Sequence, residues 1–360
     1  MIDFELGDEL ALIRETALGF ANDQLRPRDR EFEKARAVAA EVHEAFRAIG
    51  LGAIEVPEEQ GGAGLGALAR VLVFEELAAA DAGAALALDS LGPALYPLLE
   101  LAGEDALDAL ARPVLERTGA RGVLVWDGAG RVRRERGRVS AEIPWVPTDR
   151  VDLLVILDPT GAVCVSEGIA RSELRGAGLR AAGASALRLE DAPVRAAWEG
   201  AAGARRALAR ARLYAAALLV GVMRAASDFS REYALNREAF GRPIAHHQAL
   251  AFLIADMATA VESTRLLVQE AAWRIDGGEE AAEPCATAFL EAAEQAMFVT
   301  PNALQILGGH GFMQDYPVEK FMREARTLGL LFGGTDAARE EAGRELDTTP
   351  GPAAVGGAGA

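Results

Sequence analysis

The chain has 360 residues, of which 51% are hydrophobic and 25% are charged, so it can bury a core large enough for two or three domains. Its formal net charge of -17 repels phosphate backbones and anionic lipid, which argues against nucleic acid and membrane partners. The two cysteines form no CxxC pair, and the N-terminus lacks the basic region of a signal peptide. We therefore expect a globular, cytoplasmic protein.

The first third of the chain has helical periodicity. Apolar side chains recur at helical spacing from Leu6 to Phe20, and amphipathic stretches follow at 35–50, 66–80 and 103–116. An N-terminal helical domain is therefore predicted for residues 1–117.

A glycine pattern in this region has two interpretations. Gly62, Gly64 and Ala67 fit G-x-G-x-x-A, the fingerprint of dinucleotide-binding turns. No second β-α-β unit follows to build the parallel sheet that such a site needs. Gly176, Gly178 and Ala181 match the same pattern with no helix behind them, so we predict no dinucleotide fold from either match.

The middle of the chain has the features of β structure. The segments GVLVW, GRVSAEI, VDLLVIL, GAVCV and ALRLED are short, apolar and separated by Gly, Pro and Asp turns. A small antiparallel β domain is predicted for residues 118–198.

Helical patterns return after the β segments, with Gly277-Gly278 and Gly308-Gly309 as stops. The apolar run from Leu213 to Met223 is about half as long as a membrane span and is predicted to be a buried helix. We predict a C-terminal helical bundle for 199–347 and a disordered tail for 348–360. The predicted helices run over 204–236, 247–276, 284–307 and 335–346, so the fold class is α+β and mainly α.

A dense polar stretch, REAFGRPIAHHQAL at 237–250, follows the first of these helices. The adjacent His246 and His247 point to different sides of a helix or strand, so we predict no metal site here. No Ser or Cys lies in a nucleophile elbow, which leaves hydrolase chemistry without support.

This stretch, followed by QILGGHGFMQDYPVEKFMREAR, resembles the paired flavin signatures of the acyl-CoA dehydrogenase family. IGLGAIEVPEEQGGAGLG, FEELAAAD and DAPV match the family's order and spacing, so the resemblance covers nearly the whole folded chain. It implies a helical, β, helical fold with FAD as cofactor. It also implies an oxidoreductase of fatty acid or lipid metabolism that acts on the α,β carbon-carbon bond of an acyl-CoA thioester.

The resemblance also implies which residues hold FAD. Arg237 would face the pyrophosphate, while other residues would wall the adenosine, make polar contacts or contact the adenine end from a neighbouring subunit. These residues are Phe240, Ile244, His247, Gln248, Gln305, Gly308, Gly309 and Thr335. A homodimer or homotetramer is therefore expected. The alternative is that Arg237 and Gln248 are surface residues of a helical hairpin and that the glycine pair is only a helix C-cap.

The family's catalytic Glu has no counterpart in this sequence. Gly333 stands at its position in LLFGGTDAARE, with Phe332 as the alternative occupant, and Ala211 stands at the position that other members use. Asp336 is the nearest acid, but it is better explained as a first-turn residue of a helix that Thr335 caps. The catalytic base is therefore unknown.

Arg212 stands at a position that the family uses beside the acyl-CoA site. It either meets the phosphates of the ligand, or it snorkels or pairs with an acid, and both possibilities stay open.

Three functions are compatible with these features. The first is an acyl-CoA dehydrogenase that has an unrecognised base and passes electrons to an electron-transferring flavoprotein. The second is a non-catalytic subunit in a heterotetramer with a Glu-bearing paralogue. The third is a redirected flavoenzyme with a non-CoA substrate. The middle domain keeps only VWDGAG of a longer family motif that touches flavin and substrate, which leaves substrate binding open.

Overall fold

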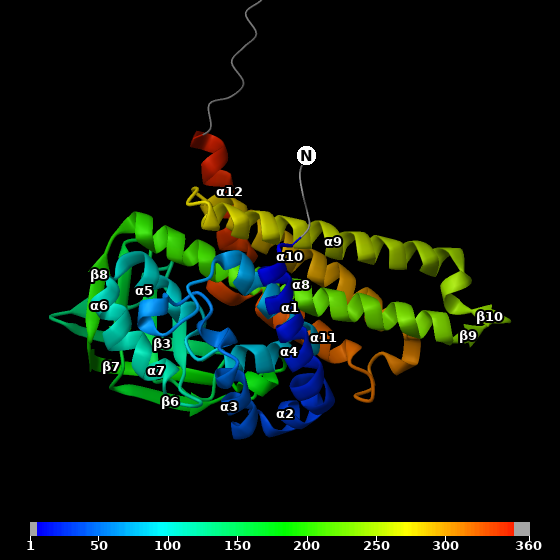
Figure 1. The fold of residues 1–360 in the computed structure, drawn as a ribbon, viewed down its shortest axis with the longest axis horizontal. Helices are drawn as coiled ribbons and strands as arrows, with labels where there is room; N and C mark the ends of the chain where they lie inside the picture. The colour runs from blue at the N-terminus through cyan, green and yellow to red at the C-terminus, as the bar shows by residue number, and fades with distance from the viewer. Residues whose placement is uncertain (1–5, 349–360) are drawn as a thin grey trace, which may run out of the picture.

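The computed structural model describes residues 6–348, with helices at both ends of the sequence and strands between them (Figure 1). This order confirms the predicted fold class. The predicted tail lies outside the described residues except for Thr348, the last residue of the final helix. The division into domains at residues 117 and 198 stays a prediction.

Seven α-helices precede the strands, and short 3₁₀ and π-helical turns join several of them. The helices are α1 (Asp8–Phe20), α2 (Asp29–Ala35), α3 (Ala40–Ala48), α4 (Ala67–Leu88), α5 (Leu95–Leu101), α6 (Glu104–Ala106) and α7 (Arg112–Leu115). The helix predicted at 66–80 extends further, to Leu88, across a kink at Asp81. The kink is capped, because the Asp81 carboxylate accepts the N–H of Ala84 at 2.9 Å.

Eight strands form two four-stranded sheets. The strands are β1 (Gly122–Trp126), β2 (Arg133–Glu135), β3 (Arg138–Val146), β4 (Leu153–Asp158), β5 (Gly161–Val165), β6 (Ile169–Glu173), β7 (Ser185–Pro193) and β8 (Ala196–Glu199). One sheet has the order β1-β4-β5-β8 and the other β2-β3-β7-β6. The pairings within these sheets are antiparallel, as predicted, except that β1 and β4 are parallel.

The first sheet is buried on both faces. Leu153, Val155 and Leu157 of β4 pack into the helical core, while Leu154 and Ile156 pack into a second core between the two sheets. Because successive side chains of a strand point to opposite faces, a strand in this position needs an unbroken apolar run. The sequence VDLLVIL meets this need.

The remaining helices form a bundle built around α8. They are α8 (Ala201–Asn236), α9 (Gln248–Asp276), α10 (Ala282–Ile306), α11 (Val318–Leu328) and α12 (Gly334–Thr348). α8 is long and apolar enough to span a bilayer by length and composition, but 83% of its apolar window is buried inside the protein. At 1.5 Å per residue α8 is about 54 Å long. It runs from the strands at one end of the molecule to a small hairpin at the other (Figure 1).

The two glycine patterns are packing features. An added Cβ at Gly62 would lie 2.0 Å from the Val56 carbonyl oxygen, and one at Gly178 would lie 2.1 Å from Thr327 Oγ1. Both glycines therefore allow segments to approach closely. The helix start that follows the first pattern is already occupied, because the Asp276 carboxylate accepts the N–H groups of Ala67 and Leu68 at 2.6 and 3.0 Å.

Candidate functional site

A short β-hairpin with a two-residue turn follows α8 and carries the first predicted flavin motif. Its strands are β9 (Glu238–Ala239) and β10 (Arg242–Pro243), and its turn residues Phe240 and Gly241 have φ values of 55° and 79°. Positive φ at both positions is what a tight hairpin turn requires, and glycine accepts it more readily than phenylalanine. The turn holds the Phe240 side chain 94% exposed at the tip.

His247 fixes the hairpin to the start of α9. One ring nitrogen lies 3.2 Å from the Ala239 carbonyl oxygen, and the other lies 3.2 Å from the Arg242 guanidinium. Arg237 is exposed at the end of α8, and within residues 6–344 it has no ion-pair partner. The hairpin therefore presents an aromatic ring and a free guanidinium on a fixed backbone.

The second motif lies at the same end of the bundle. The Tyr233 hydroxyl of α8 is 2.8 Å from His310 Nδ1, which ties the turn after α10 to the end of α8. Gly308 has φ 57°, and an added Cβ at Gly308 or Gly309 would meet no atom within 4 Å. The backbone of this turn is therefore open to a ligand.

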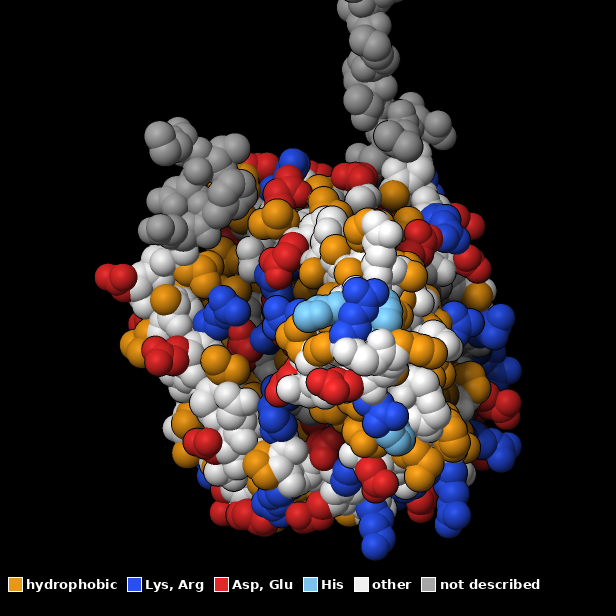
Figure 2. Space-filling model, turned by 90° about the vertical axis from the view of Figure 1, so that its right-hand side faces the viewer, with side chains coloured by type: hydrophobic (Ala, Val, Ile, Leu, Met, Phe, Trp, Pro, Cys, Tyr) orange, Lys and Arg blue, Asp and Glu red, His pale blue; other side chains and the backbone are white. Residues whose placement is uncertain are grey.

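This end of the molecule faces the viewer in Figure 2, where His and Arg side chains lie among apolar ones. Gln248 and Gln305 are exposed, and Ile244 is half-buried. A free guanidinium, an exposed aromatic ring and open backbone are groups that bind a pyrophosphate and an adenosine. The residues present therefore fit the nucleotide part of FAD.

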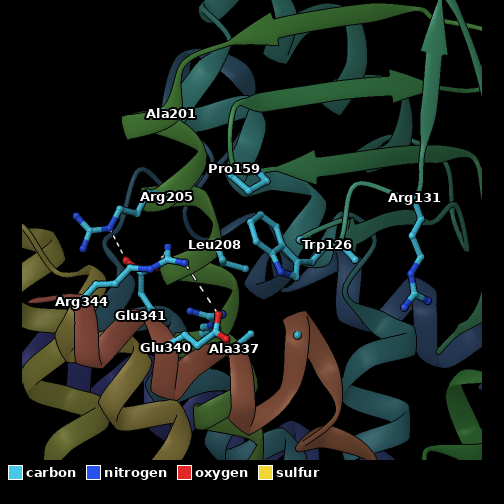
Figure 3. A pocket seen from close by; sticks show the side chains of 14 residues that line it. Trp126, Arg131, Pro159, Ala201, Arg205, Leu208, Ala337, Glu340, Glu341 and Arg344 are labelled. Carbon is cyan, nitrogen blue, oxygen red and sulfur yellow. Dashed lines mark hydrogen bonds and ion pairs between the residues drawn. The ribbon is translucent and has the colours of Figure 1, made fainter.

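A cleft of about 760 Å³ lies between the strands, α8 and α12 (Figure 3). It is lined by Trp126, Gly128, Ala129, Arg131, Pro159, Ala201, Arg205, Leu208, Arg212, Gly333, Ala337, Glu340, Glu341 and Arg344. Its size and its apolar walls beside a few polar groups are typical of ligand sites.

Gly333 lines this cleft, but its position has no room for a side chain. Its φ is 91°, and an added Cβ would lie 2.7 Å from Ala337 Cβ and 3.2 Å from Trp126 Cδ1. Trp126 is itself held close to Gly128, where an added Cβ would lie 2.5 Å from the indole nitrogen. The indole and Ala337 thus occupy the space next to the position predicted for a base.

The other positions weighed for a base hold no suitable acid. Ala211 is fully buried. The Asp336 side chain is 97% exposed, pairs with Arg339 at 3.5 Å and does not line the cleft. It lies in the first turn of α12, as predicted, but the helix begins at Gly334, so Thr335 lies inside it and is not its N-cap.

Arg212 reaches the cleft from α8, and both interpretations of it can be tested against the geometry. It is 2% exposed, no acid pairs with it, and its Nε has no hydrogen-bond partner. Burial lowers its pKa to about 10, which still leaves it charged at neutral pH. It therefore does not snorkel to solvent, and it forms no ion pair within residues 6–344, although the Glu341 carboxylate favours its charged form.

Several charged residues of the cleft were missed in the sequence. Glu341 pairs with Arg205 at 2.5 Å and with Arg344 at 3.7 Å, while Glu340 lies 4.0 Å from Arg344. Positions 201, 205, 208 and 212 lie on one face of α8, and positions 337, 340, 341 and 344 lie on one face of α12. This helical spacing from Arg212 and Gly333 was the signal that could have found them.

The predicted flavin residues at the hairpin and the predicted substrate residue Arg212 in the cleft lie far apart. Arg212 and Arg237 are separated by 25 residues of α8 and its cap, which corresponds to about 37 Å. Figure 1 places the strands and the hairpin at opposite ends of the long helices. One chain therefore does not bring its hairpin to its own cleft.

Comparison with known proteins covers the whole fold. The family model of the acyl-CoA dehydrogenase N-terminal domain matches residues 7–115, and that of the C-terminal domain matches residues 198–346. Acryloyl-CoA reductase (NADH) of Anaerotignum propionicum is 30% identical over 96% of each chain.

Solved structures give the same result. A chain from a structure of the electron transferring flavoprotein of Acidaminococcus fermentans has a TM-score of 0.84 with 27% identity, covering 96% of this chain and 99% of that one. Butyryl-CoA dehydrogenase from Megasphaera elsdenii has a TM-score of 0.84 with 24% identity, covering 96% of this chain and 100% of that one.

Proposed function

The chain belongs to the acyl-CoA dehydrogenase family, and we propose that its cleft between the strands and α12 binds the acyl-CoA thioester on which this flavin-dependent oxidoreductase acts. One observation carries the assignment: a cleft of about 760 Å³ has an unpaired, buried guanidinium, Arg212, on its wall. In a chain of net charge -17, that guanidinium gives the cleft a local attraction for an anionic ligand.

FAD is the cofactor of this family, and when bound it exchanges a hydride with the β carbon of the acyl group. We propose that Arg237 pairs with the FAD pyrophosphate and that Phe240 and Ile244 cover the adenosine. The side chains of His247, Gln248 and Gln305 supply hydrogen bonds, and the open backbone at Gly308 and Gly309 lies against the nucleotide. Thr335, in the first turn of α12, is proposed to contact the cofactor from the cleft side.

We further propose a homodimer, or a homotetramer of two such dimers. The hairpin of one chain then reaches the cleft of its partner, because about 37 Å of α8 separates Arg237 from Arg212 within one chain. The exposed Phe240, Phe252 and Phe312 near the hairpin favour this arrangement, since a protein in water leaves few large aromatic rings uncovered. The partner of each site is then a second copy of the chain.

A second function is favoured by the geometry at Gly333. Where the family has its base, this chain has a glycine with φ 91° and with Ala337 in close contact. A side chain at that position would be strained, because φ is positive and the added Cβ would lie 2.7 Å from Ala337 Cβ. A chain built this way suits the non-catalytic subunit of a heterotetramer, in which a Glu-bearing paralogue abstracts the α proton.

An anaerobic visible spectrum of the purified protein decides between the two. Titration with short acyl-CoA thioesters should bleach the flavin band if this chain oxidises them alone. Reduced protein mixed with enoyl-CoA should recover the band if the chain works as a reductase, like its acryloyl-CoA relative. Flavin that responds to neither, together with co-purification of a Glu-bearing paralogue, would identify the non-catalytic subunit.

An electron-transferring flavoprotein is proposed as the redox partner, and a chain from a structure of such a protein is among the structural neighbours. A cytoplasmic location is proposed because both cysteines, Cys164 and Cys285, are buried and unbridged. Fatty acid or lipid metabolism is the corresponding role.

A further inference from the structure

Two arginines of the cleft form no ion pair with an acid of residues 6–344. Arg205 and Arg344 are paired with Glu341, and Glu340 adds a second carboxylate beside Arg344. Arg131 on the strand side and Arg212 on α8 form no ion pair within residues 6–344. The uncompensated charge of the cleft is therefore positive at two places, one at the rim and one in the wall.

The two arginines differ in burial. Arg131 is exposed at the rim, where Figure 3 shows its side chain extending from the strands beside the cleft. Arg212 is 2% exposed and its Nε has no partner. The Glu341 carboxylate favours the charged form of Arg212 without forming an ion pair with it. A buried guanidinium that lacks a direct ion pair is disfavoured, and an anion that reaches it regains the lost interaction. The Arg212 guanidinium is thus a preformed binding site for the anionic group of a ligand.

A second, separate cavity lies near the cleft. The 3₁₀ turn Leu331–Gly333 separates the cleft from a second cavity of about 50 Å³, lined by Leu86, Phe332 and Arg121 among others. The Arg121 guanidinium is held there by the carbonyl oxygens of Leu86, Ala87 and Asp89, the latter two at 2.6 and 2.8 Å. A volume of this size holds roughly one or two water molecules. It does not hold an extended alkyl chain.

We propose that the substrate is a CoA thioester with an acyl group that ends in a carboxylate, which pairs with Arg212, while Arg131 meets a phosphate of CoA. Guanidinium and carboxylate match each other in two parallel hydrogen bonds, which gives the cleft selectivity for the charged end. The inference rests on the proposed function, because it names the substrate class of the same cleft.

The test compares succinyl-CoA with butyryl-CoA, which have acyl groups of four carbons and differ in a terminal carboxylate or methyl group. Calorimetric titration of the flavin-loaded protein should give succinyl-CoA at least about tenfold tighter binding, equivalent to one charged pair. Arg212→Gln should remove this preference by weakening succinyl-CoA alone. Arg131→Gln should weaken both thioesters equally and make binding less dependent on salt.

Two further variants control for folding and position. Arg212→Lys keeps the charge without the planar fork and should retain part of the preference, which separates charge from loss of structure. Arg206→Gln alters an arginine on the same helix that pairs with Glu100 outside the cleft, and should leave both affinities unchanged.

Three results would overturn the inference. Equal or tighter binding of butyryl-CoA would reject the carboxylate and leave the acyl-CoA assignment intact. Loss of flavin from folded Arg212→Gln, with the thioester preference unchanged, would reassign Arg212 to the FAD phosphates. Binding of neither thioester would reject the inference and the proposed function together.

Discussion

Gly333 is the residue predicted to stand at the position of the family's catalytic Glu. The motif comparison predicts that Gly333 stands at the position of the catalytic Glu, but it says nothing of the space around that position. In the structure, a Cβ added to this backbone of φ 91° would lie close to Trp126 and Ala337. Reintroducing a carboxylate at this single position is therefore not expected to restore a base.

Substitution of Gly333 should reveal this closure as lost stability. We expect Gly333→Ala to lower the free energy of unfolding by about 1–3 kcal/mol. The alanine would have to adopt the positive φ of this position, and its Cβ would lie 2.7 Å from Ala337 Cβ. Gly343→Ala is the matched control, since Gly343 lies in α12 with nothing within 4 Å of an added Cβ. It should be neutral or stabilising by about 0.5–1 kcal/mol. Equal effects of the two substitutions in chemical denaturation would contradict the account.

A second prediction at this scale concerns Glu324, which is 1% exposed in α11. Burial raises its pKa to about 7, although Lys320 lies 3.4 Å away and lowers it. The folded state therefore holds a proton that the unfolded chain releases near its ordinary pKa of 4.5. The resulting stabilisation is present below pH 4.5 and is lost as the pH rises through 7.

Glu324→Gln removes this titration. Relative to the natural protein, the variant should gain stability between pH 5 and pH 8, by roughly 1–3 kcal/mol. Denaturant unfolding at both pH values measures the difference. A relative loss of stability over the same range would show that the ionised carboxylate is the favoured form in the fold.

At the scale of elements, the start of α4 depends on a residue 209 positions away in the sequence. Asp276, the last residue of α9, accepts the N–H groups of Ala67 and Leu68, which α4 leaves without partners in its own helix. Gly66 permits the approach, since an added Cβ would lie 2.3 Å from the Asp276 carboxylate.

Removing this cap should weaken the contact between the N-terminal helices and the bundle. Asp276→Ala is expected to cost about 1–2 kcal/mol of stability. Asp228→Ala is the control, because Asp228 forms only an exposed pair with Arg231 at 3.3 Å, and its loss should cost less than about 0.5 kcal/mol. Thermal unfolding of both variants measures the difference, and equal melting temperatures would exclude the capping role.

The β9-β10 hairpin makes the opposite prediction, an effect on binding without one on folding. Phe240→Ala should leave the free energy of unfolding of the flavin-free protein within about 0.5 kcal/mol, because the ring is 94% exposed. Flavin affinity should fall by about fivefold to a hundredfold as one stacked aromatic contact is lost. Leu12→Ala, an exposed apolar residue on α1, should change neither quantity. A destabilised chain with unchanged flavin affinity would contradict the assignment.

How far the elements could be predicted depended on burial. The buried strands β1, β4 and β5 stood out as apolar runs, whereas β2 and β6 are largely polar and exposed and were missed. The helix α11 was hidden inside the flavin motif, and its polar residues include the buried Lys320 and Glu324. Val318, Phe321, Ala325 and Leu328 recur at helical spacing in α11, so this apolar pattern could have predicted the helix, whereas the burial of Lys320 and Glu324 follows only from the fold.

At the scale of the whole molecule, the motifs predicted the flavin residues but not where they lie relative to the cleft. The sequence placed Arg212 and Arg237 on one helical pattern, and only the structure separates them to opposite ends of the molecule (Figure 1). The charged lining of the cleft could not be predicted from the sequence either, because Arg131, Arg205 and Glu341 come from three segments that the fold brings together. The central claim is therefore a site shared by two chains.

Mixed dimers test this claim most directly. One chain carries Arg237→Ala and Phe240→Ala at the hairpin, and the other carries Ala337→Trp, which fills the cleft. The two variant chains carry different affinity tags and are co-expressed. Successive purification on both tags then isolates the mixed dimer.

Each variant alone should lose flavin, whereas the mixed dimer should retain about half of the natural flavin content, because one of its two sites combines an intact cleft with an intact hairpin. Absorbance of the flavin band per chain measures this content. A mixed dimer without flavin would contradict the shared site and place each cofactor within a single chain.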